Sequence, residues 1–462
     1  MALMTKDREF YKSFFTMVFF IALQNLVVQS VNLASNIMVG AYSEHALSGV
    51  AIVNQIQFLL QMLINGAGEG VVVLGAQYWG QKNTASIKKI IGSGVYLALG
   101  LGLLFLLATS VAPRQLLLLL TNDEAVIAEG LQYLSVTRFS YVFFCLSMVF
   151  LSSMRSVENV RIGTVISLST LFVNVGLSYI LIFGSFGAPR LGSAGAGFAV
   201  LAARVIEFFI LLGYMLFIEK KIAMRIADFF HFELAIFWDY IKVGLPVIGA
   251  GAVWGLAMGV QTAILGRLGG SAIAANSIQA TIFSMLTVLS YGGASAASVM
   301  TGKIIGRGEG NNLREYVRSM QLLFLALGCL ACVLLLSCKD LILGFYQVTP
   351  ETYALSGQFL NVVAFTSIGT SYQVACLTGI VRGGGDTKFV LINDTIFMWL
   401  VVLPASALCA FVWNLPPVIV FLALKSDQVL KCFVAIWHVN FHGYRWVRKL
   451  TKAPAAEAEG GD

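Results

Sequence analysis

The sequence carries few groups that could do chemistry, and the most isolated of them is a carboxylate in an apolar run. Between Ala46 and Gln81, Glu69 is the only ionisable side chain apart from tyrosine. Four amide side chains precede it, and they are Asn54, Gln57, Gln61 and Asn65. Together with Glu69 these residues are spaced by 3, 4, 4 and 4 positions. On a helix this spacing makes one polar stripe about 22 Å long. A carboxylate at the end of such a stripe can bind and release a proton or a small cation, so we predict an ion-coupling role for Glu69.

Further polar residues extend this candidate site. Asp394 lies near one end of another apolar run and is the second carboxylate that we expect to bind the coupling ion. A second polar stripe runs along residues 13–39, and two polar side chains in the second half of the chain join it. The predicted substrate-cavity residues are Asn25, Gln29, Asn32, Ser35, Asn36, Asn54, Gln57, Gln61, Asn65, Tyr291 and Gln373.

Other interpretations of these polar groups remain open at this point. Polar stripes also hold membrane helices together through hydrogen bonds between helices. Arg138 has no acidic neighbour in the sequence, so it could partner Glu69 across helices. Glu207 lies three residues from Arg204 on one helical face, which favours a local ion pair.

The sequence offers no set of residues typical of a catalytic or metal site. The four histidines are scattered and do not have the spacing of metal ligands. The glycine-rich stretches "GAGEG" and "VRGGGD" do not follow a strand, so they do not indicate a phosphate-binding loop. We therefore expect no enzyme, no metal and no cofactor.

The elements that must position these residues are membrane-spanning helices. The chain is 58% hydrophobic and 11% charged over 462 residues, which is typical of a membrane protein that crosses the bilayer many times. A spanning helix needs about 20 mainly apolar residues, and the apolar blocks are too long for barrel strands. The expected twelve spans are 13–39, 46–79, 88–111, 131–154, 162–185, 193–218, 238–264, 271–304, 315–337, 356–381, 388–411 and 415–437.

The positive charges indicate the orientation of these spans. Most lysines and arginines of the connections fall on the side that holds both termini, whereas the other side has only Arg114, Arg190, Arg267 and Lys339. Cytoplasmic loops carry this excess, so both termini should be cytoplasmic in a cell (inner) membrane protein. The net charge of +7 is thereby explained without a nucleic-acid partner. We expect a monomer surrounded by lipid.

The chain also repeats itself. A shift of 226 residues places Gly66 on Gly292 and Gly80 on Gly306 without a gap. The sequence thus predicts an all-α protein with two pseudo-symmetric six-helix bundles: an N-terminal lobe (1–218), a cytoplasmic linker (219–237), a C-terminal lobe (238–440) and a cytoplasmic tail (441–462). Parallel repeats of this kind are typical of transporters whose substrate path lies between the halves.

Several stretches resemble one transporter family. They include "SVNLASNIMVG", "LFVNVGLSYILIFGSFGAPRLGSAGAGFAVLAARVIE", "GLPVIGAGAVWGLAMGVQTAILGRLGG" and "VRGGGDTKFVLINDTIFMWLVVLP". Together they resemble the multidrug and toxic compound extrusion (MATE) efflux transporters over almost the whole chain. The resemblance implies two six-helix bundles, alternating access and export of a solute against an inward flow of Na⁺ or H⁺.

The chain departs from this family at three positions. Members often carry coupling acids where this sequence has Ser35, Gly251 and Ser371. The coupling mechanism that the resemblance implies therefore cannot be transferred directly, and Glu69 gains importance.

These observations together predict a secondary active antiporter that exports amphipathic organic compounds in exchange for H⁺ or Na⁺. A flippase for a lipid-linked saccharide is the alternative within the same superfamily. It would need several cavity-lining arginines or lysines for a pyrophosphate, and Arg138, Arg204 and Lys425 are few for this purpose. A polytopic membrane enzyme is the third possibility and would need a histidine or acid pair on one helical face.

Overall fold

The structure is a computed structural model that describes residues 4–230, 233–308, 310–344, 348–441 and 446–447. Within these ranges the chain is helical, with one isolated bridge between Gly385 and Val447 as the only strand-like pairing. Ten of the described helices are long and apolar enough to cross a membrane, or eleven when one bent pair is counted as a single span. The predicted all-α, multi-pass membrane fold is confirmed.

The first half of the chain follows the predicted spans closely. Its helices are α1 (Arg8–Tyr42), α2 (Glu44–Gly80), α3 (Thr84–Val111), α4 (Pro113–Leu118), α5 (Glu124–Thr137), α6 (Ser140–Ser156), α7 (Arg161–Phe183) and α8 (Gly192–Gly213), with the short turns η1 (Ser185–Gly187) and η2 (Tyr214–Ile218). Side chains cap the N-termini of three of these helices. Asp7, Ser43 and Asn83 accept backbone N–H groups at the beginnings of α1, α2 and α3, which satisfies donors that have no partner inside the helix.

The second half repeats this plan with more interruptions. The linker contains η3 (Ile226–Phe230), and the helices are α9 (Leu234–Gly266), α10 (Gly270–Gly306), α11 (Gly310–Leu343), α12 (Pro350–Gln373), η4 (Val374–Val381), α13 (Thr387–Thr395), η5 (Ile396–Val402), α14 (Leu403–Ala407), η6 (Leu408–Val412), α15 (Pro417–Lys425) and α16 (Asp427–Asn440). The expected twelfth span is present as α15 and α16. It contains three charged residues, Lys425, Asp427 and Lys431.

The fourth predicted span, 131–154, is bent rather than continuous. Helices α5 and α6 meet at an angle of 56° at Arg138 and Phe139. Thr137 donates its hydroxyl to the Tyr133 carbonyl, and Ser140 donates to the Thr137 carbonyl. Hydroxyls that bond preceding carbonyls often bend helices, so this pair accounts for a break that contains no proline.

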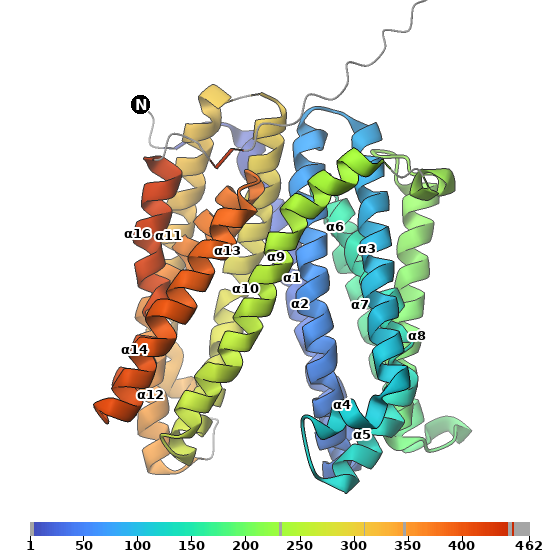
Figure 1. The fold of residues 1–462 in the computed structure, drawn as a ribbon, viewed down its shortest axis with the longest axis vertical. Helices are drawn as coiled ribbons and strands as arrows, with labels where there is room; N and C mark the ends of the chain where they lie inside the picture. Colours follow the sequence, from blue (N-terminus) through green and yellow to red (C-terminus); the bar gives the residue numbers. More distant parts are fainter. Residues whose placement is uncertain (1–3, 231–232, 309, 345–347, 442–445, 448–462) are drawn as a thin grey trace, which may run out of the picture.

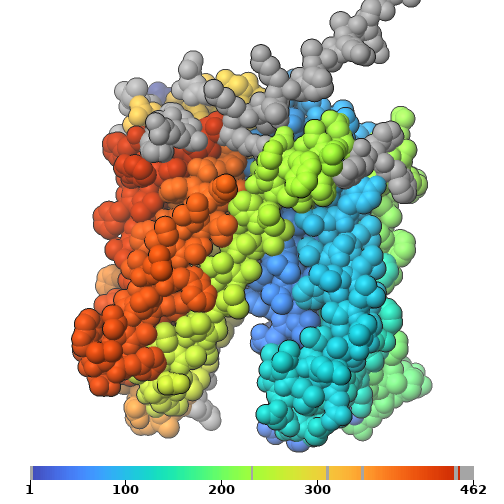
Figure 2. Space-filling model, in the orientation of Figure 1, coloured from blue at the N-terminus to red at the C-terminus, as the bar shows by residue number. Residues whose placement is uncertain are grey.

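The helices form two lobes that meet at one end and separate at the other (Figure 1). We call the end that holds Gly80 and Gly306 the closed end, and the end with the turns at Ser43 and Gly269 the open end. In the space-filling view a hollow separates α9 from the N-terminal lobe towards the open end (Figure 2). The cleft between the lobes is therefore accessible from one side.

Glycines bring the lobes together at the closed end. A Cβ on Gly306 would lie 1.9 Å from the Gln77 carbonyl oxygen of α2, and one on Gly80 would lie 2.3 Å from the Lys303 carbonyl oxygen of α10. Farther along α2, a Cβ on Gly66 would lie 2.6 Å from the backbone of α9. The lack of a side chain at these positions permits a backbone contact that any larger residue would prevent.

Two helices cross between the lobes. The first half of α1 packs on the C-terminal lobe, where Phe10 and Phe14 contact the rings of Tyr316 and Phe324 on α11. Helix α9 begins beside the N-terminal lobe, and Tyr240 donates its hydroxyl to the Ala67 carbonyl of α2. The first half of α1 and the beginning of α9 therefore each pack against the lobe formed by the other half of the sequence.

The linker is tied to the closed end of α3 by ion pairs. Lys88 lies 2.9 Å from Asp228, and Lys89 contacts Glu233. Partial burial disfavours the charged form of Asp228, but the Lys88 ammonium and the Arg225 N–H outweigh this effect and lower the pKa of the carboxyl. The second half of the predicted linker is thus joined to the N-terminal lobe at two points.

Candidate functional site

The amide stripe on α2 is not bonded to neighbouring helices. Asn54, Gln57, Gln61 and Asn65 are half-buried, and none of their side chains makes a hydrogen bond to another described residue. Amides that hold helices together would donate and accept across the helix contact. The geometry therefore favours the interpretation in which these groups are available to water or a solute.

The stripe on α1 has the same character with one exception. Asn25, Gln29, Asn32 and Asn36 are exposed and have no hydrogen-bond partner among the described residues. Ser35 instead donates its hydroxyl to the Asn174 Oδ1 atom of α7, at 3.1 Å. The position at which related transporters often carry an acid is thus used here for a contact within the N-terminal lobe.

Glu69 is paired with Arg155, and the suggestion that Arg138 is its partner is wrong. The Glu69 Oε1 atom lies 3.7 Å from Nη1 of Arg155, in the last turn of α6. The same Nη1 atom donates to Ser295 Oγ on α10 at 3.2 Å, so it joins the two lobes. Ser295 is the position that the internal repeat equates with Glu69.

Arg138 lies elsewhere because of the bend between α5 and α6. Its guanidinium lies over the Phe139 ring, 5.0 Å from the ring centroid, and its Nε atom is buried without a hydrogen-bond partner among the described residues. The predicted local pair of Glu207 and Arg204 is confirmed, with a separation of 2.6 Å.

Further polar contacts seal the closed end beside Glu69. Lys303 of α10 lies 2.6 Å from Glu158, which follows α6. The Gln77 amide of α2 donates to the Gly383 carbonyl in the turn before α13, at 3.1 Å. Both contacts cross from one lobe to the other. The stripe on α2 therefore leads from the open end of the cleft to a carboxylate close to the point where the lobes are joined.

Asp394 belongs to a separate ion cluster in the C-terminal lobe. The Lys431 ammonium of α16 lies 2.8 Å from Asp394 and 3.4 Å from Asp427. The Gln428 side-chain amide donates to Asp427, and the Gln373 amide donates to the side-chain Oε1 atom of Gln428 at 3.0 Å. Lys431 and Asp427 are almost fully buried, whereas the Asp394 side chain is 31% exposed. Asp394 is thus the member of the cluster that a solute could reach.

Gly251 and Ser371, the other two positions at which the family pattern has an acid, make packing or hydrogen-bond contacts in this structure. A Cβ on Gly251 would lie 3.2 Å from the Met62 carbonyl oxygen of α2, so this position faces a helix backbone and not an open cavity. The Ser371 hydroxyl is hydrogen-bonded to that of Ser290 on α10, at 2.8 Å. Tyr291, beside Ser290, is 44% exposed.

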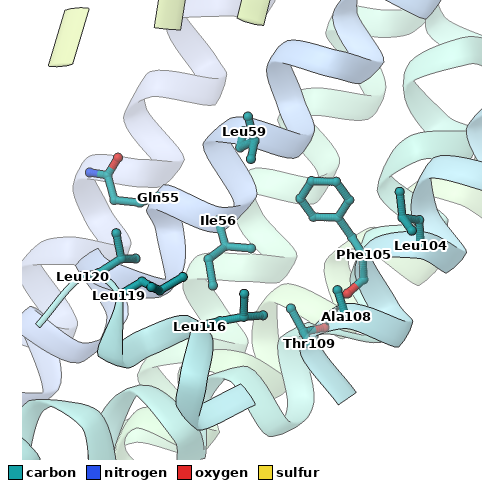
Figure 3. Close-up of a pocket in the computed structure, with 10 residues that line it drawn as sticks. All are labelled: Gln55, Ile56, Leu59, Leu104, Phe105, Ala108, Thr109, Leu116, Leu119 and Leu120. Carbon is teal, nitrogen blue, oxygen red and sulfur yellow. Dashed lines mark hydrogen bonds between the residues drawn. The ribbon is translucent and has the colours of Figure 1, made fainter. Parts of the chain in front are cut away.

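An apolar cavity of about 480 Å³ lies apart from these charges. It is lined by α2, α3, α4 and the residues after α4, and Gln55 and Thr109 are its polar side chains (Figure 3). None of the predicted cavity residues lines it. Within the described ranges, no group of three or more histidines, cysteines or acids is arranged to hold a metal ion.

Two functional candidates escaped the sequence-based prediction. Arg155 and Lys431 are not among the site residues that the sequence predicts, although each contacts one of the two predicted carboxylates. The internal repeat contains a signal for Arg155. A shift of 227 residues places Arg155 on Arg382, and a shift of 226 residues places Glu69 on Ser295. Both arginines therefore occupy matched positions in the repeat, after the fourth and tenth predicted spans.

Comparison with known proteins gives a consistent result. The family model MatE matches residues 21–180 and 246–408, one stretch in each half. A "Probable multidrug resistance protein NorM" of Listeria monocytogenes is 25% identical over 431 residues, covering 92% of this chain and 93% of that protein. A protein of the same name from Oceanobacillus iheyensis is 26% identical, covering 86% and 90%. The fold matches a solved structure described as the outward-facing conformation of a multidrug resistance MATE family transporter, with a TM-score of 0.84, 16% identity and coverage of 94% and 97%.

Proposed function

The chain belongs to the MatE family, the multidrug and toxic compound extrusion transporters, and from this premise we propose that it is a secondary active exporter of amphipathic organic compounds. It exchanges them for H⁺ or Na⁺ by alternating access in the cell membrane. The names of the Listeria and Oceanobacillus relatives support efflux of several compounds, and a sealed end opposite an open cleft supports alternating access.

The observation that carries this proposal is the unbonded amide stripe that ends at a charged contact between the lobes. Solute or water that enters the cleft meets the α1 and α2 amides and then Glu69. Glu69 holds Arg155, which also reaches Ser295 in the other lobe. A proton or cation that neutralises Glu69 therefore changes a contact on which the closed end depends. A ligand shifts a conformational equilibrium only through such a difference in binding free energy.

We assign the principal coupling role to Glu69 and a secondary one to Asp394. Both carboxylates already hold a basic group, so a coupling ion must compete with Arg155 at one site and with Lys431 at the other. Asp394 is the more exposed acid of its cluster, and Lys431 retains Asp427 when Asp394 is neutralised. This arrangement makes the second site tolerant of change.

The proposal is tested with purified protein in liposomes. A panel of amphipathic fluorescent compounds is loaded, and their movement is followed under an imposed pH gradient, an imposed Na⁺ gradient or neither. We expect movement against the concentration gradient with one of the two ions. Equal rates under all three conditions would exclude antiport, and no movement of any compound would exclude export of this substrate class.

A further inference from the structure

Lys425, the last residue of α15, forms an ion pair with no carboxylate among the described residues, although the Asp427 carboxylate attracts it from beyond ion-pair distance. Its ammonium lies 4.7 Å from the ring centroid of Phe283 on α10 and 5.6 Å from that of Phe421 on α15. It makes no hydrogen bond or ion pair with any described residue. Asp427, two residues further on, is occupied by Lys431 and by the Gln428 amide.

The two aromatic rings beside Lys425 differ in burial. Phe421 is buried and stacks on the buried Phe359 of α12, with ring centroids 4.0 Å apart and the planes 7° apart. Phe283 is half-buried, and the internal repeat equates it with Gln57 of the α2 stripe. Lys425 is itself half-buried, so its ammonium lies beside the α10 face that corresponds to the solute-facing stripe of the other lobe.

The charges of the spans are not balanced around this point. Glu69 and Glu207 each contact an arginine, and Asp394 and Asp427 share Lys431. Each of these carboxylates therefore already has a basic partner with which an organic cation would have to compete. In contrast, Lys425 presents three N–H donors that the aromatic rings can attract but cannot satisfy as hydrogen-bond acceptors. A charged group is retained at bilayer depth mainly where it faces a cavity or a partner.

We propose that Lys425 and Phe283 form a recognition site for the carboxylate or sulfonate group of an amphipathic organic anion. The anionic oxygens accept the ammonium N–H groups, and the apolar part of the compound packs on the Phe283 ring. This inference rests on the proposed export function, because it names the class of compound that the cleft admits. The phosphate group of an anionic lipid could accept the same N–H groups. The experiment therefore distinguishes a lipid phosphate from an organic anion as the ligand.

Binding is measured without transport, with protein in nanodiscs of phosphatidylcholine. The probes are a dansyl-labelled undecanoic acid, its methyl ester and the corresponding undecylamine. The parent protein should bind the acid more tightly than the amine. Lys425→Gln should weaken binding of the acid about 10- to 100-fold, the size expected for hydrogen bonds to a charged group, and leave the ester unchanged. Lys425→Arg should retain most of the affinity.

Arg267 gives a matched control, because it also lies over an aromatic ring, 5.7 Å from the Phe411 centroid, but at the open end of α9. Arg267→Gln should not change the affinity for any probe. Nanodiscs that contain phosphatidylglycerol identify the occupant: competition with the acid probe in the parent but not in Lys425→Gln would assign the site to lipid phosphate, and no competition would assign it to the organic anion.

Two results would overturn the proposal. One is a parent protein that binds the amine more tightly than the acid, which requires no variant and so does not depend on how Lys425→Gln folds. The other is a folded Lys425→Gln variant with parental affinity for the acid. If binding behaves as expected but liposome assays show no movement of any probe, the export function fails and the anion site remains.

Discussion

Neutralising Glu69 should uncouple export from the ion gradient while leaving the protein able to exchange substrate. At 3.7 Å, two unit charges attract each other by about 4–5 kcal/mol at an effective dielectric constant of about 20. The side chains keep 17% and 19% exposure, and desolvation of both ions offsets much of this attraction. We take a net contribution of about 1.5–3 kcal/mol, which lies within the usual range of coupling free energies between two sites.

This contribution is large enough to control the lobes but too small to lock them. It corresponds to a change of about 10- to 150-fold in the equilibrium between two packings of the lobes. Glu69→Gln fixes the neutral form, so the equilibrium no longer responds to protons or cations. Liposome uptake driven by a pH or Na⁺ gradient should therefore be lost, whereas exchange of labelled for unlabelled substrate without a gradient should continue. Glu69→Asp should keep part of the driven uptake with a shifted pH profile.

Controls separate coupling from structural support. Arg155→Gln should also lose the gradient response, and Arg138→Gln should retain it, because only the first arginine contacts Glu69. Gradient-driven uptake by Glu69→Gln at the parental level would refute the reasoning. A Glu69→Gln protein that fails to reach the membrane, and is restored by the additional Arg155→Gln change, would show that the pair only supports folding.

Three other perturbations address the glycine contact, the second carboxylate and the orientation. Gly306→Ala should separate the lobes at the closed end, because its Cβ would lie 1.9 Å from a carbonyl oxygen of α2; spin labels on α2 and α10 would measure this, and an unchanged distance distribution would count against a tight seam. Asp394→Asn should lose only part of the driven uptake, because Lys431 keeps a second carboxylate, and complete loss at normal expression would make Asp394 the principal coupling acid. A reporter fused after Lys82 should give a cytoplasmic signal and one after Arg190 an external signal, whereas the opposite pattern would reverse inside and outside.

The positions of the helices could be predicted from the sequence, because the length of each apolar run fixes where a membrane helix begins and ends. The run 271–304 became α10 (Gly270–Gly306), and 88–111 became α3 (Thr84–Val111). Bends within the helices were harder to predict from the sequence. The bend in the fourth span depends on hydroxyl groups that compete for backbone carbonyls, and residues such as Thr137 and Ser140 also occur in straight helices.

The partner of Glu69 could not be predicted because it depends on the tilt and rotation of helices from different parts of the chain. A sequence gives the approximate depth of each charge along its own helix but not its neighbour in the bundle. Arg138 was a candidate because it lies within a predicted span and has no acidic neighbour in the sequence. The bend removes it from the cleft, whereas Arg155, at the end of α6, reaches across to α2 and α10.

The three missing family acids and the two carboxylate sites can be understood together. Ser35 and Ser371 make hydrogen bonds inside their own lobes, and Gly251 faces the backbone of α2, so these positions serve packing in this chain. The two proposed coupling carboxylates, Glu69 and Asp394, each hold a basic side chain. A carboxylate that is already paired with a basic side chain can still couple ion binding to transport, because the ion that binds replaces a contact that the protein already makes. The free energy of ion binding is then exchanged directly for that of an internal ion pair, which is the difference between states that alternating access requires.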